Sequence, residues 1–273
     1  MYNIILSIFS FIILTICYFM FTSYGKLPIT METINTNQIS IYNSLNFPRL
    51  SIYFIILLLV QYYINIDQIK KCYSNNIMRQ GFIKICLPWF LIFGITMLVL
   101  NMFPDMLKAF SGTLGLMYIY NNGIYILNNI LMNPSDYSKL QSNTLADGEE
   151  TASLALSEEI SNMINQNKDV LLNQLTPKNF GYIFEMLNPI IRTDIDVSAQ
   201  KEELLELIST KENIGEFSWY IYTGLFTIFV VYLNLRCIKK IKNKNVEQEQ
   251  EQVLPKNRKF TKEDALTNPP LPK

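Results

Sequence analysis

The sequence contains no histidine, which excludes a histidine metal site and a histidine-based catalytic triad. Only 17% of its 273 residues are charged, below the roughly one quarter that is typical of soluble domains. No phosphate-binding glycine loop, dinucleotide fingerprint or C-x-x-C pair occurs. The four cysteines are scattered without metal-ligand spacing: Cys17, Cys72, Cys86 and Cys237. These absences predict a protein that is not an enzyme and holds no metal, cofactor or small-molecule substrate.

In place of catalytic or metal-binding motifs, the chain contains long uncharged apolar segments. About 20 apolar residues, each rising roughly 1.5 Å, cross the hydrocarbon core of a bilayer. The predicted spans are residues 4–22, 50–66, 85–104 and 217–235. In the third span we expect Pro88 in the first turn, and Gly94 permits close approach of another helix. The fold class predicted is all-α, with about four transmembrane helices and an extramembrane domain between the third and fourth.

The charged residues outside these spans orient them, because basic loops stay on the cytoplasmic side of a membrane. Residues 67–84 contain four basic residues and one acid, and a basic cluster follows Leu235. A topology of four spans, with both termini on the basic side, places every loop in agreement with the positive-inside rule. Residues 4–22 are either a retained signal-anchor helix, which we favour, or a cleaved signal peptide, and the other orientations are the same in both cases.

Residues 105–216 would then face the opposite side of the membrane. They contain seven basic and sixteen acidic residues, a net charge of −9. This excess argues against nucleic acid as a partner. The acidic character indicates either a solvated surface or a docking face for a basic partner.

Helical periodicity runs through much of this acidic region. Apolar residues recur at helical spacing over residues 149–175, Thr176-Pro177 suits the start of a further helix, and Asp196 or Ser198 suits another. The uncharged stretch 109–132 contains four asparagines, which are costly in hydrocarbon. We therefore expect a small helical domain with a possible interfacial or re-entrant segment at 109–132.

Residues 236–273 form the predicted tail. The tail is basic at first, and then rich in glutamate, glutamine and proline with almost no aliphatic residues. Such a composition cannot bury enough surface to fold, so we expect disorder. The terminal NPPLPK is alternatively a polyproline ligand.

Three sequence blocks precede or enter the last span: FPDMLKAFSGTLGL at 103–116, LTPKNFGYIFEML at 175–187 and KENIGEFSWYIYTG at 211–224. In order and spacing they resemble the membrane-anchored minor capsid or inner-membrane proteins of large nucleocytoplasmic DNA viruses. The residues that carry the resemblance are Phe103, Pro104, Phe110, Ser111, Thr113, Gly115, Pro177, Asn179, Phe180, Glu216, Trp219, Tyr220, Thr223 and Gly224. The chain departs from the family pattern at Asp105-Met106, which replaces Gly-Trp, and at Gly112, which replaces Asn.

The resemblance implies a structural protein of the virion's internal membrane, and of the host-derived assembly membrane during infection. Its implied partners are the lipid bilayer and capsid or other virion membrane proteins. In physical terms, Trp219 and Tyr220 suit the headgroup level, and Thr223-Gly224 offers a small-residue patch for another helix. Glu216 is placed to pair with a basic group. A generic interfacial belt of aromatic residues is the alternative interpretation.

A cellular multi-pass protein, such as a channel-like or respiratory-complex accessory subunit, is the competing hypothesis. Its pore-lining candidates within the spans are Asn101, Thr223 and Asn234. The absence of charge from all four predicted spans argues against a proton- or ion-coupled carrier. A membrane enzyme that uses an acid of residues 105–216 ranks third.

Overall fold

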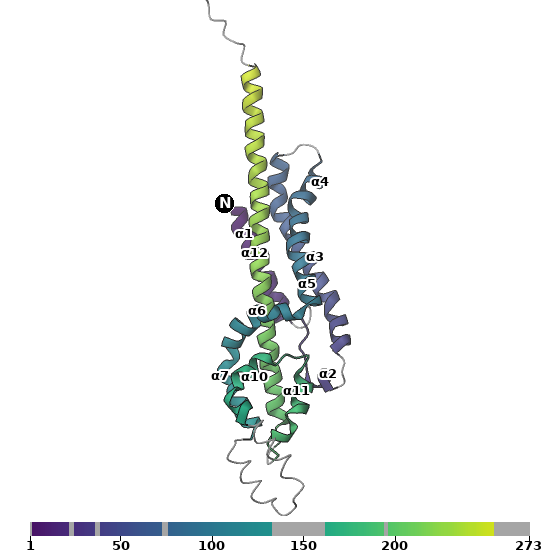
Figure 1. Ribbon diagram of the computed structural model, residues 1–273. Coiled ribbons are helices and arrows are strands. Elements are labelled where there is room, and N and C mark those ends of the chain that lie inside the picture. The colour runs from purple at the N-terminus through teal and green to yellow at the C-terminus, as the bar shows by residue number, and fades with distance from the viewer. Residues whose placement is uncertain are drawn as a thin grey trace, which may run out of the picture.

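The computed structural model describes residues 2–21, 25–35, 39–72, 76–132, 162–193 and 196–253 (Figure 1). The described residues form helices and their connections, and they contain no strand. Their only strand-like feature is one antiparallel bridge between Leu131 and Ile191. The all-α prediction is confirmed.

A helical bundle makes up one half of the molecule (Figure 1). It contains α1 (Tyr2–Met20), α3 (Ile39–Cys72), the segment from α4 (Ile77–Gly81) to α5 (Ile95–Met102), and the later part of α12 (Ser198–Val253). Helix α1 packs against both α3 and α12. All four parts contribute to one buried core, which includes Phe11, Leu57, Trp89, Phe93, Tyr220 and Val231.

Among the described residues, three helices are long and apolar enough to cross a membrane, namely Ser44–Lys71, Ile77–Met102 and Ser198–Arg236. They are compatible with a membrane location for the chain. The apolar helix Ile4–Met20 is shorter, yet its Phe11 is fully buried in the bundle core. The helices that contain the second and third predicted spans begin well before residues 50 and 85, and the fourth span is part of a much longer helix.

Pro88 lies in the interior of the third helix, so its predicted place in a first turn is wrong. The helix starts at Ile77, and π-helical segments η1 (Phe82–Cys86) and η2 (Trp89–Gly94) flank the proline. Proline lacks an N–H and its ring crowds the carbonyl four residues earlier, and a π-helix relaxes that register. A Cβ at Gly94 would lie 3.0 Å from the Phe54 ring of α3, in agreement with the close approach expected there.

A helical domain forms the other half of the molecule (Figure 1). After the bundle, the chain continues through η3 (Pro104–Leu107), α6 (Lys108–Phe110) and η4 (Ser111–Gly115) into α7 (Leu116–Ile130). Helix α7 packs against α10 (Lys168–Gln174) and α12. The stretch 109–132, expected to be interfacial or re-entrant, therefore buries one face of α7 in the domain core, through Ile119, Ile126, Leu127 and Ile130.

The remaining pieces of the helical domain are short. They are α2 (Met31–Asn35), α11 (Phe180–Met186) and η5 (Asn188–Ile190). Helix α2 comes from the connection between α1 and α3, yet its Ile34 lies in the same core as Phe184. Part of the helical pattern expected over 149–175 lies outside the described residues.

The two expected helix starts differ in how the structure treats them. The Thr176 N–H donates to Asn179 Oδ1 at 2.7 Å, and the Asn179 N–H donates to Thr176 Oγ1 at 3.3 Å, just before α11. The Ser198 N–H donates to Asp196 Oδ1 at 3.0 Å at the start of α12. At α12 the Asp196 side chain satisfies a backbone group that a helix terminus leaves without a partner. The helix expected to start at Thr176-Pro177 begins instead at Phe180, and its N-cap residue Asn179 makes no side-chain capping hydrogen bond.

Helix α12 is continuous over 56 residues, roughly 84 Å at about 1.5 Å per residue. Leu204, Leu205 and Ile208 near its start lie in the domain core. Tyr220 and Ile228, further along, lie in the bundle core. The domain and the last span thus share one helix where two were expected.

The expectation of a disordered tail from residue 236 is wrong as far as Val253, because α12 continues to that residue. Lysine, glutamate and glutamine are good helix formers, and a helix already nucleated in the bundle extends at little cost. Residues 254–273 lie outside the described part of the chain.

Candidate functional site at the junction

The three sequence blocks, which are far apart along the chain, meet on one segment of α12. Elements η4 and α6 from the first block contact α12. The carbonyl of Leu175, from the second block, accepts a hydrogen bond from Lys211 in the third. This meeting point lies between the helical domain and the bundle (Figure 1), and we call it the junction.

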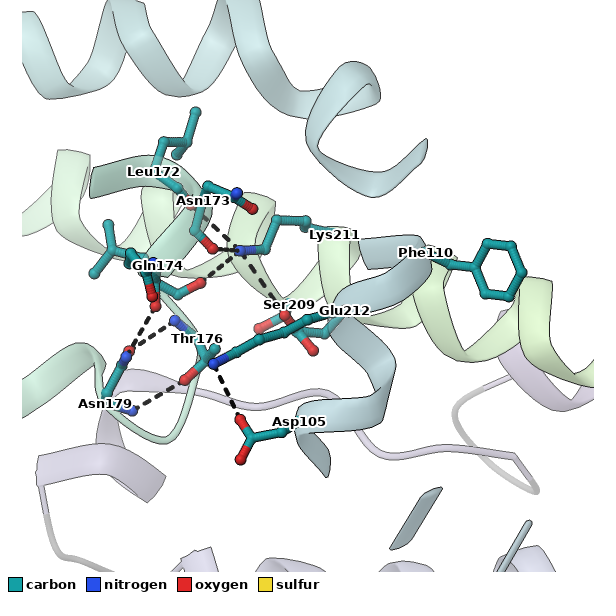
Figure 2. A network of polar contacts seen from close by, with 12 residues as sticks. Asp105, Phe110, Leu172, Asn173, Gln174, Thr176, Asn179, Ser209, Lys211 and Glu212 are labelled. Atoms are coloured by element: carbon teal, nitrogen blue, oxygen red, sulfur yellow. Dashed lines mark hydrogen bonds and ion pairs between the residues drawn. The ribbon is translucent and has the colours of Figure 1, made fainter. Parts of the chain in front are cut away.

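Lys211 is the buried centre of the junction on its domain side. Its side chain is 1% exposed. The Nζ donates to the carbonyls of Leu172, Asn173 and Leu175 at 3.3, 2.9 and 2.6 Å, as Figure 2 shows in part. These carbonyls belong to the C-terminal end of α10, where orphan carbonyls and the helix dipole both favour a cation. The hydrogen bonds of Lys211 therefore hold the C-terminal end of α10 against α12.

Two glycines let η4 and α12 cross at very short range. The carbonyl of Lys211 lies against the α-carbon of Gly115, where any side chain would collide with it. A Cβ on Gly215 would lie 2.7 Å from the Ser111 Cβ and 2.8 Å from its backbone nitrogen. Ser111 and Gly115, both singled out from the sequence, thus serve as contact points for α12.

Glu216, expected to pair with a basic partner, forms an ion pair with Lys26 of the same chain. Their side chains are 19% and 13% exposed, for Lys26 and Glu216 respectively. The other Glu216 oxygen, Oε1, accepts a hydrogen bond from the Tyr220 hydroxyl at 2.6 Å. Burial is the largest influence and disfavours the charged form of Lys26, but Glu216, Tyr42 and Glu212 together outweigh it, and the lysine pKa is raised above its ordinary value.

A tight turn after α1 positions Lys26. The Gly25 N–H donates to the Phe21 carbonyl at 2.7 Å and the Lys26 N–H donates to the Tyr18 carbonyl at 3.0 Å. A Cβ on Gly25 would lie 2.8 Å from the Phe21 oxygen, so the turn needs glycine. Arg49 Nη1 also donates to the Gly25 carbonyl at 3.0 Å. The pair with Glu216 therefore joins this turn to α12.

Aromatic residues surround α12 at the junction. The Phe110 ring lies 5.1 Å from the Trp219 ring in an edge-on arrangement and 5.3 Å from the Tyr222 ring in a stacked one. Trp219 Nε1 donates to the Met106 carbonyl at 3.0 Å. Tyr220 is 1% exposed. The tryptophan thus bonds within the chain, to η3.

Gly224 receives a neighbouring helix, as its small size predicts. The Phe11 ring of α1 lies directly over its α-carbon, where a side chain would overlap it. Phe11 also contacts the rings of Trp89 and Phe93, with centroids 5.8 and 5.7 Å away. Thr223 Oγ1 donates back to the Trp219 carbonyl of its own helix at 2.8 Å.

The other predicted residues lie around this centre with less direct roles. Pro177 is buried, Asn179 exchanges hydrogen bonds with Thr176, and the buried Phe180 stacks on Phe184 with centroids 4.5 Å apart. Pro104 begins η3. Phe103 is 57% exposed, and the exposed Thr113 bonds only to its own helix, at the Ala109 carbonyl.

A cavity of about 190 Å3 opens at the junction. Helices α3, α5 and α12, the turn after α1, and residues 176–178 all contribute to its wall. Its charged lining residues are Lys26, Asp105, Lys108, Lys178, Glu212 and Glu216. Lys108 Nζ lies 3.0 Å from Asp105 Oδ1.

Sequence reasoning missed several polar groups inside the bundle. Gln61 and Asn65 on α3 are 1% and 6% exposed. Gln61 Nε2 donates to the Ser7 carbonyl at 3.0 Å, and Asn65 Nδ2 donates to Ser7 Oγ at 3.1 Å. These bonds tie α3 to α1, as amides in a membrane often do. The sequence did contain a signal for these groups, because Gln61 and Asn65 are one helical turn apart within an apolar segment.

The described residues contain no group of three or more histidine, cysteine, aspartate or glutamate side chains placed to hold a metal. Comparison with protein-family models, curated proteins and solved structures finds no match to this chain.

Proposed function

We propose that this chain is a structural membrane protein that holds an extramembrane helical domain in a set position relative to a lipid bilayer. The observation that carries the proposal is the continuity of α12, which contributes Ile208 to the domain core and Ile228 to the bundle core without a break. A shared helix transmits position and force, whereas a flexible linker would not. Lys211 and the Lys26–Glu216 pair brace both sides of the junction.

The particle we propose is that of a large nucleocytoplasmic DNA virus, with the chain linking the internal membrane to the capsid or minor capsid network. The support is that the blocks resembling such proteins converge on residues 211–224 of α12. The acidic domain is then the surface that faces the capsid partners, and no enzymatic activity is needed for this role.

Mass spectrometry of purified particles tests this proposal. The chain should be present in intact virions and should stay with the capsid fraction after mild detergent removes the lipid. Absence of the chain from the particles would refute the viral role. Co-purification with a cellular complex, or ion flux after reconstitution, would favour the cellular alternative.

Crosslinking of intact particles tests which face meets the capsid. Lys178 and Lys201 lie in the helical domain, whereas Lys70 and Lys71 end α3 at the other end of the bundle (Figure 1). The domain lysines should crosslink to capsid proteins, and the α3 lysines serve as the internal control. Capsid crosslinks only from Lys70 and Lys71 would reverse the proposed orientation.

A further inference from the structure

Two helices of the bundle carry exposed apolar stripes at helical spacing, and both stripes run toward the helical domain. The stripe of α12 consists of Leu233, Phe229, Phe226 and Tyr222. The stripe of the helix Ile77–Met102 consists of Leu91, Ile95, Leu98 and Met102. Because both helices are apolar and long enough to span a bilayer, these outward faces are the ones that hydrocarbon would cover.

Both stripes continue onto the segment that joins the bundle to the domain. Phe103 directly follows Met102 and is 57% exposed, and Met106 in η3 is 46% exposed. From the other helix, the Tyr222 ring stacks on the Phe110 ring of α6, with centroids 5.3 Å apart. The exposed apolar surface of the two helices therefore extends onto this segment. We call these five residues the collar.

Contacts with α12 fix the level of the collar along the bundle. Trp219 Nε1 donates to the Met106 carbonyl at 3.0 Å, and the Phe110 ring packs edge-on against the Trp219 ring. Figure 1 shows α6 lying across α12 at the end of the bundle nearest the domain, and the two helices are in contact.

This level coincides with the edge of the hydrocarbon. Trp219 and Tyr222 lie two and five residues after Phe217, where the last uncharged segment begins, which is about 3 to 8 Å along a helix. The headgroup region adds about 5–8 Å to each side of the hydrocarbon core. Tryptophan and tyrosine are enriched at this boundary, and the collar surrounds both of them.

The charge of the collar segment also suits a lipid surface. Between residues 102 and 132 the sequence contains two charged residues, Asp105 and Lys108. Lys108 Nζ lies 3.0 Å from Asp105 Oδ1, so their charges offset one another. Residues 105–216 as a whole have a net charge of −9, which anionic headgroups would repel. The neutral collar is the part of this region that can enter the interface without that repulsion.

We propose that the collar lies in the bilayer interface, with Met102, Phe103 and Met106 inserted among the upper acyl chains beside Tyr222. Helix α12 then sets the direction of the domain, and the collar sets the depth at which the bundle enters the bilayer. This inference rests on the proposed membrane placement of the bundle. It moves the interfacial contact, expected at 109–132, to residues 102–110.

Spin labels on the full-length chain in phosphatidylcholine vesicles test this inference. Single cysteines would be introduced by Met106→Cys, Met186→Cys and Leu98→Cys in a variant whose four native cysteines are replaced. Met186 is the matched control, because it is an exposed methionine of the helical domain on α11. The ratio of collisions with oxygen, which concentrates in hydrocarbon, to collisions with a water-soluble nickel chelate should be severalfold higher at position 106 than at 186.

The label at position 98 separates failure of the collar from failure of the membrane placement. If 98 lies in hydrocarbon while 106 is as accessible to nickel as 186, the collar proposal is wrong and the membrane placement stands. If 98 is also accessible to nickel, both are wrong. A label at 106 that is immobile and shielded from both reagents would show that protein covers this surface, and would also overturn the proposal.

The depth-setting role has its own test. Met106→Glu places a carboxylate in the collar, which hydrocarbon disfavours, and should shift a label at Leu98→Cys toward the headgroups. Met186→Glu adds the same charge to the domain and should leave that label where it is. Equal positions of the label in the two variants would remove the depth-setting role from the collar.

Photolabelling of the unchanged chain supplies a measurement that needs no substitution. A phosphatidylcholine that carries a diazirine near the glycerol end of its acyl chain should label residues 102–106, and should leave residues 180–186 of α11 unlabelled. Labelling of the bundle helices without residues 102–106 would contradict the proposal.

Discussion

Substitution of Gly215 by alanine tests the close crossing of η4 and α12. The new Cβ would lie 2.7 Å from the Ser111 Cβ and 2.8 Å from the Ser111 nitrogen, whereas ordinary contact begins at 3.4 Å. The two elements must therefore separate by several tenths of an ångström, and the obstacle is backbone rather than a movable side-chain tip. Overpacking of this kind costs about 1–3 kcal/mol.

Part of that cost is offset, because alanine is favoured over glycine inside a helix by about 0.5–1 kcal/mol. The net loss expected for Gly215→Ala is about 1–2 kcal/mol. For a chain of this size that corresponds to a fall in Tm of roughly 2–8 °C. The assay is thermal unfolding of the full-length protein in mild detergent, with SDS titration as an independent measure of stability.

The control for this experiment is Gly112→Ala, one helical turn before Gly115 in η4. A Cβ at Gly112 would lie 3.0 Å from Asn173 Oδ1, the end of an exposed side chain that can move aside. We expect its Tm to be unchanged or slightly raised. If Gly215→Ala is as stable as the unchanged protein, or if both variants lose the same stability, the close crossing does not constrain the junction.

Two further predictions concern the buried lysines. The double-mutant cycle of Lys26→Met and Glu216→Gln should give a coupling of about 1–3 kcal/mol, and a coupling near zero would refute the brace between turn and helix. Because the pKa of Lys26 is raised, this stabilisation should be constant from about pH 7 to 9 and disappear as pH rises beyond about 10.5 through the raised value. Lys211→Met should cost about 2–4 kcal/mol, because three carbonyls lose a charged donor. The exposed Lys178→Met should cost less than about 0.5 kcal/mol, and equal losses would show that the carbonyl bonds do not matter.

Local sequence signals predicted the elements well where one principle dominated. Apolar length predicted the three long helices, because burial in hydrocarbon requires it. Asp196 marked the start of α12, because its side chain bonds the free Ser198 N–H near by in sequence. Helix α11 begins at Phe180, after the start predicted at Thr176-Pro177. Gly224 marked a close helix contact, but its partner Phe11 lies more than two hundred residues away and was not identifiable.

The failures have equally specific causes. Pro88 was placed at a helix start because an interior proline is costly, but π-helical segments absorb that cost. The polar composition after residue 236 predicted disorder, but the helix was already nucleated by packing upstream. The domain and the last span were predicted as separate segments, but Gly215 lies inside one helix that belongs to both.

The sequence by itself determined the class of this protein: its apolar segments, its segregated charges and its lack of catalytic motifs follow from composition and local order. Only the tertiary structure decided the partners of its charges. Lys26 and Glu216 are 190 residues apart, and Lys211 bonds carbonyls 36–39 residues earlier. Such pairings depend on how helices pack in three dimensions, and no local pattern encodes that arrangement.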